Sequence, residues 1–366
     1  MEQSDLGDLK KIKNIRSKID NIDDKLLELL NKRASLVIEV GKVKLEGKRD
    51  FYVPAREKEI YQRLIRNNTG PFPNQALRNV FREIMSASLS LEKPLHVAYL
   101  GPKATFTHQA CMHFFGLSAE FIPEKDIADI FDDVERGKVD FGVVPIENTT
   151  EGVVSHTIDM FVTSDIKICG EITMEVSLSL LNRTGKIHDV KKIYSHPHAI
   201  AECKEWLRGR FPDVPLFDVS STAMAAQTSS EDLSSAAIAS EFAATLYDLQ
   251  VVERKIEDHS NNFTRFLVIG KKNPDKSGDD KTSVMFAVKD MPGALYEILK
   301  PFAERGINLT KIESRPQKGK AWEYIFFVDM DGHVSDSKVS KSIKELETKC
   351  SFMKIMGSYP KGGLKQ

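Results

Sequence analysis

The first 45 residues hold the pattern that most constrains this chain: a helical repeat from about Asp8 to Leu45 without proline and without glycine before Gly41. A helix of this length is long for a globular protein, so we expect it to pair with other helices. One heptad-spaced column of this helix consists of Ile12, Ile19, Leu26, Arg33 and Val40. An unpartnered guanidinium at a helix interface is costly, so we expect an anion beside Arg33.

Two further cations, Arg16 and Lys44, lie in a neighbouring column. At about 1.5 Å per residue, Arg16 lies about 25 Å from Arg33, too far to hold one small molecule with it. Lys44 lies about 16 Å from Arg33 and nearly in phase, so this pair is placed to bracket an extended dianion. Arg16 would then serve a second chain, which predicts an intertwined dimer. The pattern alone leaves open that these cations are solvated or pair with Asp23 or Glu28.

Changes of pattern divide the chain into three regions and a linker. Residues 1–93 are predicted to be all helical, with Pro54 and Pro73 opening the second and third helices. Residues 94–271 alternate apolar strands with helices and predict an α/β domain with two lobes around a cleft. Its expected elements are strands at 141–148, 166–182, 191–196 and 264–270, and helices near 104–114, 198–208 and 238–247.

The last part of the chain begins with a polar, turn-rich linker, residues 272–281. Residues 282–366 then follow the order strand, helix, strand, strand, helix, strand. This order predicts an α+β domain of the βαββαβ type. The whole chain is therefore expected to be a multidomain protein.

Charge and composition exclude several classes of function. Lys and Arg total 52 against 53 Asp and Glu, so nothing drives the chain globally toward nucleic acid. No apolar run approaches a membrane span or a signal peptide, which predicts a cytoplasmic protein with no membrane partner. The four cysteines are widely spaced and are expected to be reduced. His196 and His198 lack an acidic partner at matching spacing, so we expect no metal and no cofactor.

The helical region carries a recognisable set of polar residues. They are Arg16, Arg33, Lys44, Val53, Arg56, Glu57, Ser88 and Glu92. In this arrangement residues up to about 92 resemble the all-helical chorismate mutase family. The resemblance implies a pericyclic rearrangement of chorismate to prephenate, in which the enzyme holds a reactive conformer.

The resemblance also implies a role for each of these residues. Arg16 of the partner chain and Arg33 would hold the two carboxylates, and Lys44 would stabilise charge on the breaking ether oxygen. Glu57 would bind the ring hydroxyl, and Glu92 would complete the catalytic set. The remaining positions, expected to bind substrate, are Val53, Arg56 and Ser88.

Two residues depart from the family pattern. Many relatives have glutamine where Glu92 stands, and some have aspartate where Val53 stands. Glu92 can donate to an ether oxygen only when it is protonated, so the mutase step is expected to weaken as pH rises unless the site raises the pKa of Glu92. The change at Val53 is tolerable because the main chain can supply that contact.

Four separated motifs mark the α/β region: AYLGPKATFTHQA (98–110), VVPIENTTEGVV (143–154), the tripeptide at 195–197, and HSNNFTRFLVIG (259–270). Strand ends followed by short hydroxyls suit an anion, although ordinary N-capping explains any one of them. Together and in this order, across residues 95–270, they resemble prephenate dehydratase, whose fold is similar to periplasmic binding proteins.

This second resemblance implies loss of water and carbon dioxide from prephenate to give phenylpyruvate. Thr264 would be the catalytic residue, a positioned hydrogen-bond donor to the leaving hydroxyl. Strand alternation puts Thr264 and Phe266 on one face and Arg265 on the other. The residues expected to bind or orient the substrate are Asn148, Thr149, Thr150, Ser195, His196, Thr222, Arg265 and Phe266.

The βαββαβ unit resembles the ACT domain, with its phenylalanine-sensing motifs at 290–295 and 312–316. A plain dimerisation domain of the same fold remains the alternative. If it senses phenylalanine, the effector-binding residues are Gly293, Ala294, Leu295, Glu313, Ser314, Arg315 and Pro316. Feedback inhibition then requires that phenylalanine bind the less active state more tightly.

Three functions compete for the whole chain. The first is a bifunctional isomerase and lyase of phenylalanine biosynthesis, acting as a homodimer or a dimer of dimers under allosteric control. The second is an arogenate dehydratase in the α/β region, which differs by one amino group. The third is a non-catalytic metabolite sensor, for which the sequence supplies no output domain.

Overall fold

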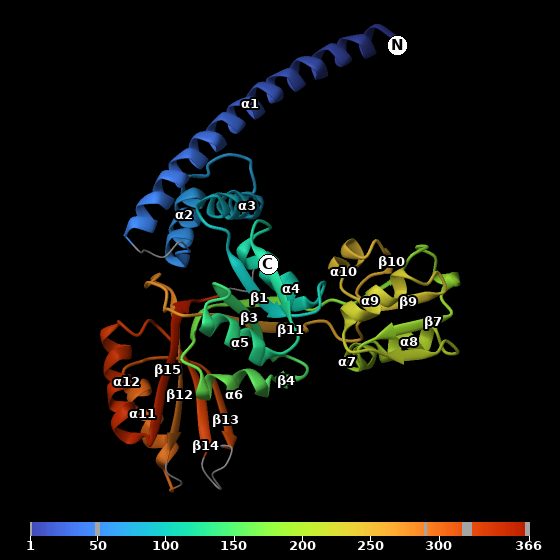
Figure 1. Cartoon of the computed structure of the whole chain (residues 1–366). Helices are drawn as coiled ribbons and strands as arrows, with labels where there is room; N and C mark the ends of the chain where they lie inside the picture. The colour runs from blue at the N-terminus through green and yellow to red at the C-terminus, as the bar shows by residue number, and fades with distance from the viewer. Residues whose placement is uncertain (1, 48–51, 289–290, 317–323, 363–366) are drawn as a thin grey trace. The chain divides into compact units, whose positions relative to one another are not determined.

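The computed structural model describes residues 2–47, 52–288, 291–316 and 324–362 (Figure 1). The chain splits into two compact units. The first comprises Met1–Val53, Ile60–Leu95 and Gly116–Ala119, and the second comprises Pro54–Glu59, His96–Phe115 and Glu120–Gln366. Among the described residues, no helix is both long and apolar enough to cross a membrane.

The first region is all helical, as predicted. Its helices are α1 (Glu2–Glu46), α2 (Pro54–Asn67) and α3 (Asn74–Glu92). Pro54 opens α2, where its missing N–H is not needed, and α3 ends before Pro94, which disfavours a helical residue ahead of it. Helix α1 packs against α3, and a Cβ on buried Gly41 would lie 3.2 Å from Glu92 Cγ. Glycine therefore lets the two helices approach closely beside Glu92.

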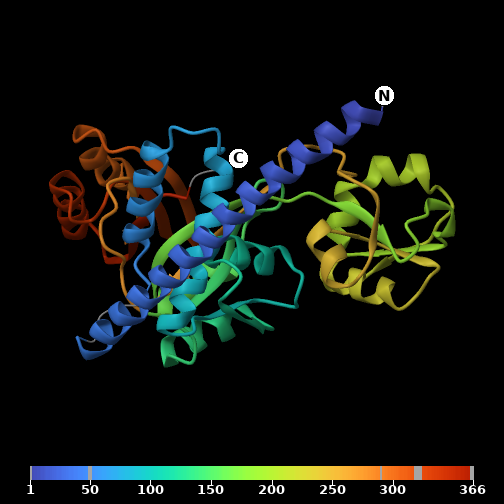
Figure 2. The same cartoon turned by 90° about the horizontal axis from the view of Figure 1, so that it is seen from above.

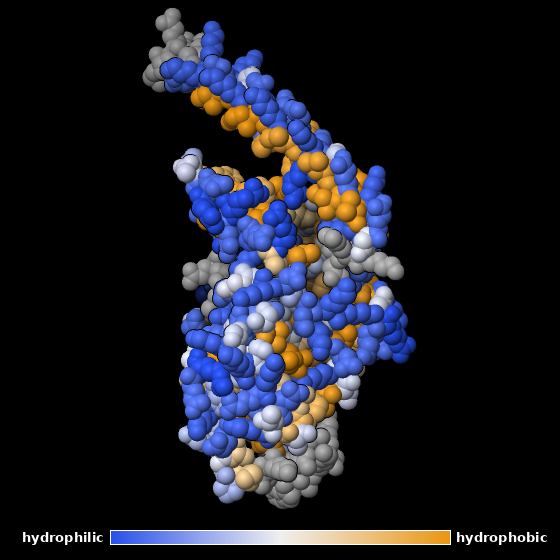
Figure 3. Space-filling view, turned by 90° about the vertical axis from the view of Figure 1, so that its left-hand side faces the viewer, coloured by the Kyte–Doolittle hydropathy of each residue, from blue (hydrophilic) through white to orange (hydrophobic). Residues whose placement is uncertain are grey.

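One side of α1 is an exposed apolar stripe (Figure 3). Its members are each at least 41% exposed and comprise Leu9, Ile12, Ile15, Ile19, Ile22, Leu26, Leu27, Leu29 and Leu30. Contiguous apolar surface of this kind marks an interaction site in soluble proteins.

The second unit begins with a sheet that forms the first lobe of the α/β region. Its strand order is β2-β1-β3-β11-β5, with the short β4 added to β3. The bounds are β1 (His96–Leu100), β2 (Glu120–Glu124), β3 (Phe141–Asn148), β4 (Gly152–Val153), β5 (Lys167–Glu175) and β11 (Phe263–Gly270). Its helices are α4 (Phe106–Phe115), α5 (Ile127–Arg136) and α6 (Ser155–Thr163). Strand β11 runs antiparallel between β3 and β5, which brings distant residues into register.

A second sheet forms the second lobe (Figure 2). Its order is β10-β6-β9-β7-β8, with bounds β6 (Ser179–Asn182), β7 (Lys192–Ser195), β8 (Leu216–Asp218), β9 (Ser235–Ala239) and β10 (Gln250–Glu253). Its helices are α7 (Pro197–Glu202), α8 (Lys204–Arg210), α9 (Thr222–Ser230), α10 (Glu241–Leu246) and the 3-10 turn η1 (Ile187–Asp189). The two-lobed α/β prediction is confirmed. The helix expected near 238–247 is partly wrong, because it starts only at Glu241 and β9 precedes it.

The C-terminal region has the predicted βαββαβ order. Its elements are β12 (Asp280–Val288), α11 (Ala294–Glu304), β13 (Leu309–Pro316), β14 (Tyr324–Asp331), α12 (Ser337–Lys349) and β15 (Phe352–Pro360). Strand β12 begins inside the segment expected to be a linker. The sheet, ordered β13-β14-β12-β15, shares a hydrophobic core with the first lobe, in which Met285, Phe327 and Tyr359 join Val144 and Leu267. The two domains therefore fold against each other.

Candidate active sites

The contact between α1 and α3 gathers four of the residues expected in the mutase site. Arg33 donates from Nη1 to the Ser88 hydroxyl, and Lys44 Nζ lies 2.8 Å from Glu92 Oε2. Burial lowers the pKa of Arg33, and the Glu92 carboxylate acts in the opposite direction. Two cations and one carboxylate thus line one half-buried surface, an arrangement that suits a ligand with two negative charges.

The other residues expected in that site are on α1 and at the start of α2. Arg16 is exposed on α1, far along the helix from Arg33. Val53 is the residue before α2, and Glu57 lies in the first turn of α2. Arg56 pairs with Glu59 at 2.8 Å, with both side chains exposed. The site predicted at Arg33 is therefore not completed by Arg16 of the same helix.

Thr264 lies in the first lobe at the point where β3 and β11 meet. In the register of these strands it faces Asn148, whose Nδ2 donates to the Thr264 hydroxyl at 2.9 Å. The Thr264 side chain is largely buried. Because its oxygen accepts this bond, its own proton remains available for donation.

The loop after β3 is pinned to the segment that enters β11. Thr149 N donates to Phe263 O at 2.9 Å, and its hydroxyl donates to Asn261 O at 3.1 Å. The N–H of Thr150 donates to Asn148 Oδ1 at 2.7 Å. These hydrogen bonds fix the loop after β3 against the start of β11. The Thr150 side chain is exposed.

In the second lobe, the expected substrate-binding residues follow strand ends. The hydroxyl of fully buried Ser195 donates to Ile238 O at 2.8 Å, so its proton is committed to the sheet. His196 caps α7 and stacks on His198, and burial followed by His198 lowers the pKa of His196. Thr222 opens α9 behind the cap residue Ser221. His196 and Thr222 are both partly exposed at the N-terminus of a helix, whereas Ser195 is fully buried.

Two residues that the sequence did not single out join this site. Asn262 Oδ1 accepts from Asn148 Nδ2 at 2.7 Å, and Asn262 Nδ2 donates to Glu202 Oε1 at 2.8 Å. Glu202 ends α7 in the second lobe. Asn262 belongs to the HSNNFTRF motif, so the motif could have identified it. Nothing in the sequence indicates that Glu202 contacts Asn262.

Arg265 faces away from Thr264, as strand alternation predicts. Its guanidinium lies 2.6 Å from Glu171, 2.7 Å from Asp329 and 3.1 Å from Glu147, and it donates to Tyr359 Oη at 3.2 Å. Burial opposes the charge, but Asp329, Tyr359 and the two glutamates hold the pKa of Arg265 above its ordinary value. The structure therefore does not bring Arg265 together with the hydroxyl of Thr264.

Phe266 shares a face with Thr264 but is fully buried in the first lobe. The side chain belongs to the hydrophobic interior, and its backbone pairs with Pro145 and Ile172 in the neighbouring strands. Its position supports the sheet beneath Thr264.

The two segments expected to bind an effector lie at one end of the C-terminal sheet. Tyr324 pairs with both Val288, the last residue of β12, and Pro316, the last of β13. Gly293, with φ of 80°, then turns the chain into α11, which starts with Ala294 and Leu295. Asp290 of this motif lies outside the described residues.

Residues of the other motif, on β13, alternate between two faces. Ser314 and Pro316 are exposed, while Glu313 and Arg315 are half-buried. Arg315 donates to Ser155 O at 2.6 Å and lies 3.4 Å from Asp159. Arg315 thus contacts α6 of the first lobe, on the face away from Ser314.

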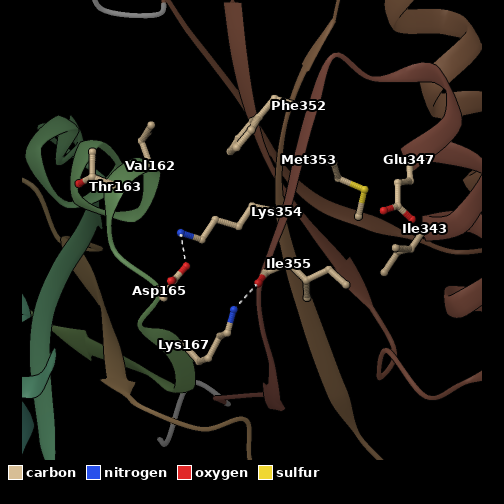
Figure 4. Close-up of a pocket in the computed structure, with 10 residues that line it drawn as sticks. All are labelled: Val162, Thr163, Asp165, Lys167, Ile343, Glu347, Phe352, Met353, Lys354 and Ile355. Atoms are coloured by element: carbon tan, nitrogen blue, oxygen red, sulfur yellow. Dashed lines mark hydrogen bonds and ion pairs between the residues drawn. The ribbon is translucent and has the colours of Figure 1, made fainter.

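A cavity of about 500 Å³ lies at the seam between the first lobe and the C-terminal sheet (Figure 4). Its cations are already engaged: Lys167 donates to Ile355 O at 3.1 Å, and Lys354 donates to Phe161 O at 3.0 Å and lies 3.6 Å from Asp165. Burial lowers the pKa of Lys354. None of the residues expected in a catalytic or effector site lines this cavity.

Comparison with protein families divides the chain in the order that its motifs indicate. Residues 15–93 match chorismate mutase type II, residues 97–274 match prephenate dehydratase, and residues 282–348 match the ACT domain. These ranges follow the helical, two-lobed and βαββαβ regions of the fold, although the first begins within α1 and the last ends before β15.

Relatives of the same length carry both enzyme names. A bifunctional chorismate mutase/prephenate dehydratase of Aquifex aeolicus is 50% identical over 98% of this chain and all of the relative, and one of Pseudomonas aeruginosa is 42% identical over 98% of this chain and all of the relative. The structure of an Arthrobacter aurescens prephenate dehydratase in complex with L-Phe is 35% identical, with a TM-score of 0.68, over 73% of this chain and 90% of that one. These relatives favour neither the arogenate nor the sensor alternative. The chain belongs to the family of bifunctional chorismate mutase/prephenate dehydratases.

Proposed function

We propose the following residue roles for this bifunctional enzyme, which rearranges chorismate to prephenate and converts prephenate to phenylpyruvate. In the mutase site, Arg33 and Arg16 of the partner chain hold the substrate carboxylates. Lys44, released from Glu92 when substrate enters, stabilises the ether oxygen. Glu57, Val53, Arg56 and Ser88 complete the pocket. Support comes from the Arg33–Ser88 and Lys44–Glu92 contacts on neighbouring helices.

In the dehydratase site, the Thr264 hydroxyl donates to the leaving hydroxyl of prephenate. The bond from the ring to its carboxylate breaks, carbon dioxide leaves, and the electron pair of that bond enters the ring. The bond from the ring to the hydroxyl then breaks, and that oxygen leaves as water with the proton from Thr264, whose hydroxyl regains a proton from solvent. Thr150, His196 and Thr222 orient the carboxylates, while Asn148 orients the Thr264 hydroxyl and Thr149 holds the loop after β3 against Asn261. The observation that carries this role is the hydrogen bond from Asn148 to Thr264 at 2.9 Å, which leaves the threonine proton free.

Phenylalanine is the effector in this proposal, and it binds at Gly293–Leu295 and Glu313–Pro316. A relative's structure contains L-Phe, and the two segments share one end of the C-terminal sheet. Purified protein given chorismate at neutral pH is expected to form prephenate and then phenylpyruvate, with the second rate falling as phenylalanine is titrated. Prephenate that accumulates without phenylpyruvate would overturn the dehydratase role, and a rate insensitive to phenylalanine would overturn the effector role.

A mixing experiment tests the shared mutase site. Arg16→Ala and Lys44→Ala are each expected to abolish mutase activity, because each removes a charge from both sites of a dimer. Random exchange of the two inactive variants leaves one intact site in each mixed dimer and restores about a quarter of the wild-type rate. Mutase activity that stays absent after subunit exchange would show that both residues act within one chain.

The same proposal sets the organisation of the whole protein. The functional regions are 1–93, 94–271 and 280–366, with 272–279 as the connection, because β12 begins at Asp280. The chain forms a homodimer through the apolar stripe on α1, and two such dimers can pair through the C-terminal sheets. We place the enzyme in the cytoplasm, where its cysteines, three of them buried, stay reduced.

A further inference from the structure

A chain of hydrogen bonds links the Thr264 hydroxyl to the carboxyl group of Glu202 in the second lobe. Asn148 Nδ2 donates to Thr264 Oγ1 at 2.9 Å and to Asn262 Oδ1 at 2.7 Å. Asn262 Nδ2 donates to Glu202 Oε1 at 2.8 Å. The side chains of Asn262 and Thr264 are largely buried, so these bonds are protected from solvent.

The backbone fixes the direction of this chain. The N–H groups of Thr150 and Glu151 donate to Asn148 Oδ1 at 2.7 Å and 2.9 Å. A backbone N–H can only donate, so this atom is the amide oxygen and the other is the NH₂ group. The amide of Asn262 is then oriented as well, with its oxygen toward Asn148 and its NH₂ group toward Glu202. Glu202 therefore accepts at one oxygen, and its other oxygen is available to carry a proton.

The surroundings of Glu202 favour its neutral form. The side chain is half-buried, and burial is the largest effect that raises its pKa. Glu151, in the loop after β3, and Glu257, in the segment after β10, raise it further. His198 on the same helix and the hydrogen bond from Asn262 act in the opposite direction, but His198 lies 3.3 Å from Glu151.

Two more titratable groups adjoin Glu202. The carboxylate of Asp258 accepts from the backbone N–H groups of Glu205 and Trp206 at 2.8 Å and 2.9 Å. Cys203 is buried, which raises the pKa of its thiol.

We propose that Glu202 is a positioning residue of the dehydratase site. This inference rests on the proposed dehydratase function. Glu202 fixes Asn262, which fixes Asn148 and so the hydroxyl of Thr264. An ionised Glu202 adds negative charge beside a substrate that carries two carboxylates, and the substrate then binds less tightly.

The test compares Glu202→Gln with the wild-type enzyme in prephenate kinetics from acid to mildly alkaline pH. In the wild type, kcat/KM is expected to fall as pH rises through the raised pKa of Glu202, mainly through an increase in KM. Glutamine stays uncharged and still accepts from Asn262, so kcat is expected to stay within about twofold of the wild type and the alkaline fall to disappear. Glu202→Ala removes the acceptor, and kcat is expected to drop about tenfold at every pH.

A control variant checks the electrostatic cause. Glu151→Gln removes one of the charges that raise the pKa of Glu202, so the fall in kcat/KM is expected to begin at lower pH than in the wild type. The mutase rate of each variant serves as the test of folding.

Three results would overturn the inference. One is a Glu202→Gln variant with the wild-type pH profile, and another is a Glu202→Ala variant with unchanged kcat. The third is a Glu202→Gln variant that loses kcat as completely as a Thr264 variant, which would make Glu202 the proton donor itself. A wild-type enzyme that forms no phenylpyruvate at any pH would instead overturn the proposed function.

Discussion

Replacing Thr264 with valine is expected to lower the dehydratase kcat by about 10²–10⁴-fold and to leave the mutase rate unchanged. Valine keeps the shape and the strand preference of threonine, so β11 retains its pairing with β3 and β5. What is lost is the hydroxyl that accepts from Asn148 and is free to donate to the leaving group. Chorismate and prephenate assays on one preparation measure both rates.

A matched substitution on the neighbouring strand controls for packing. Thr173 lies on β5, opposite Arg265 in the strand register and away from Asn148. It allows the same threonine-to-valine change at a position outside the proposed site. Thr173→Val is expected to keep both activities. If Thr264→Val lost both, the damage would be global, and if it kept the dehydratase rate, the assignment of the donor would fail.

Replacing Arg265 with methionine is expected to destabilise the second unit by about 3–5 kcal/mol, because removing one partner of a buried ion pair leaves the other charges uncompensated. Three carboxylates surround this guanidinium, and Asp329 and Glu171 are almost completely buried. Lys281 stays beside Glu171 at 2.8 Å, but no remaining cation replaces the contact at Asp329 within the described residues. The loss of unfolding free energy can be measured from hydrogen exchange of the β11 amides at increasing urea concentration.

An exposed arginine provides the control for this experiment. Arg254 pairs with Glu241 at 3.1 Å, and both side chains are more than half exposed. Arg254→Met is expected to change stability by about 0–1 kcal/mol. Equal unfolding curves for the two variants would contradict the role given to Arg265.

The ion network also predicts a pH dependence of stability. Burial opposes ionisation of Glu147, but Lys311 and Arg265 lower its pKa in the folded protein. A carboxyl whose folded pKa is depressed stabilises the fold above its unfolded pKa, and this contribution is lost as pH falls through the folded value. The difference between the wild type and Arg265→Met is therefore expected to shrink in acid.

Much of the fold could be predicted because helices and strands differ in period and in their start and stop residues. The long helix before Gly41, the prolines at α2 and α3, and the βαββαβ order all followed from local pattern. Strand β9 could not, because the run Ser235–Ala239 is rich in alanine, which favours helix locally. Its residues are all buried between β6 and β7, so tertiary packing overrides that preference.

Only the site residues that belong to sequence motifs could be predicted. Thr264 and Asn148 stand in motifs, and the register brings them together. Glu202 and Arg265 owe their surroundings to residues far away along the chain, Asn262 for the first and Asp329 for the second. Such pairings depend on how the lobes and the C-terminal sheet fold, which no single segment encodes.

The shared core of the first lobe and the C-terminal sheet bears on attempts to exchange regulatory domains between relatives. A Cβ on Gly357 would lie 2.3 Å from Ile168 O, so β15 and β5 fit backbone against backbone. A chimaera joined within the connection at 272–279 would bring together a first lobe and a C-terminal sheet from different proteins. Glu171 would then lose its ion pair with Lys281 of β12. A recombinant enzyme that keeps this packing therefore takes β5, β11 and the whole C-terminal sheet from the same parent.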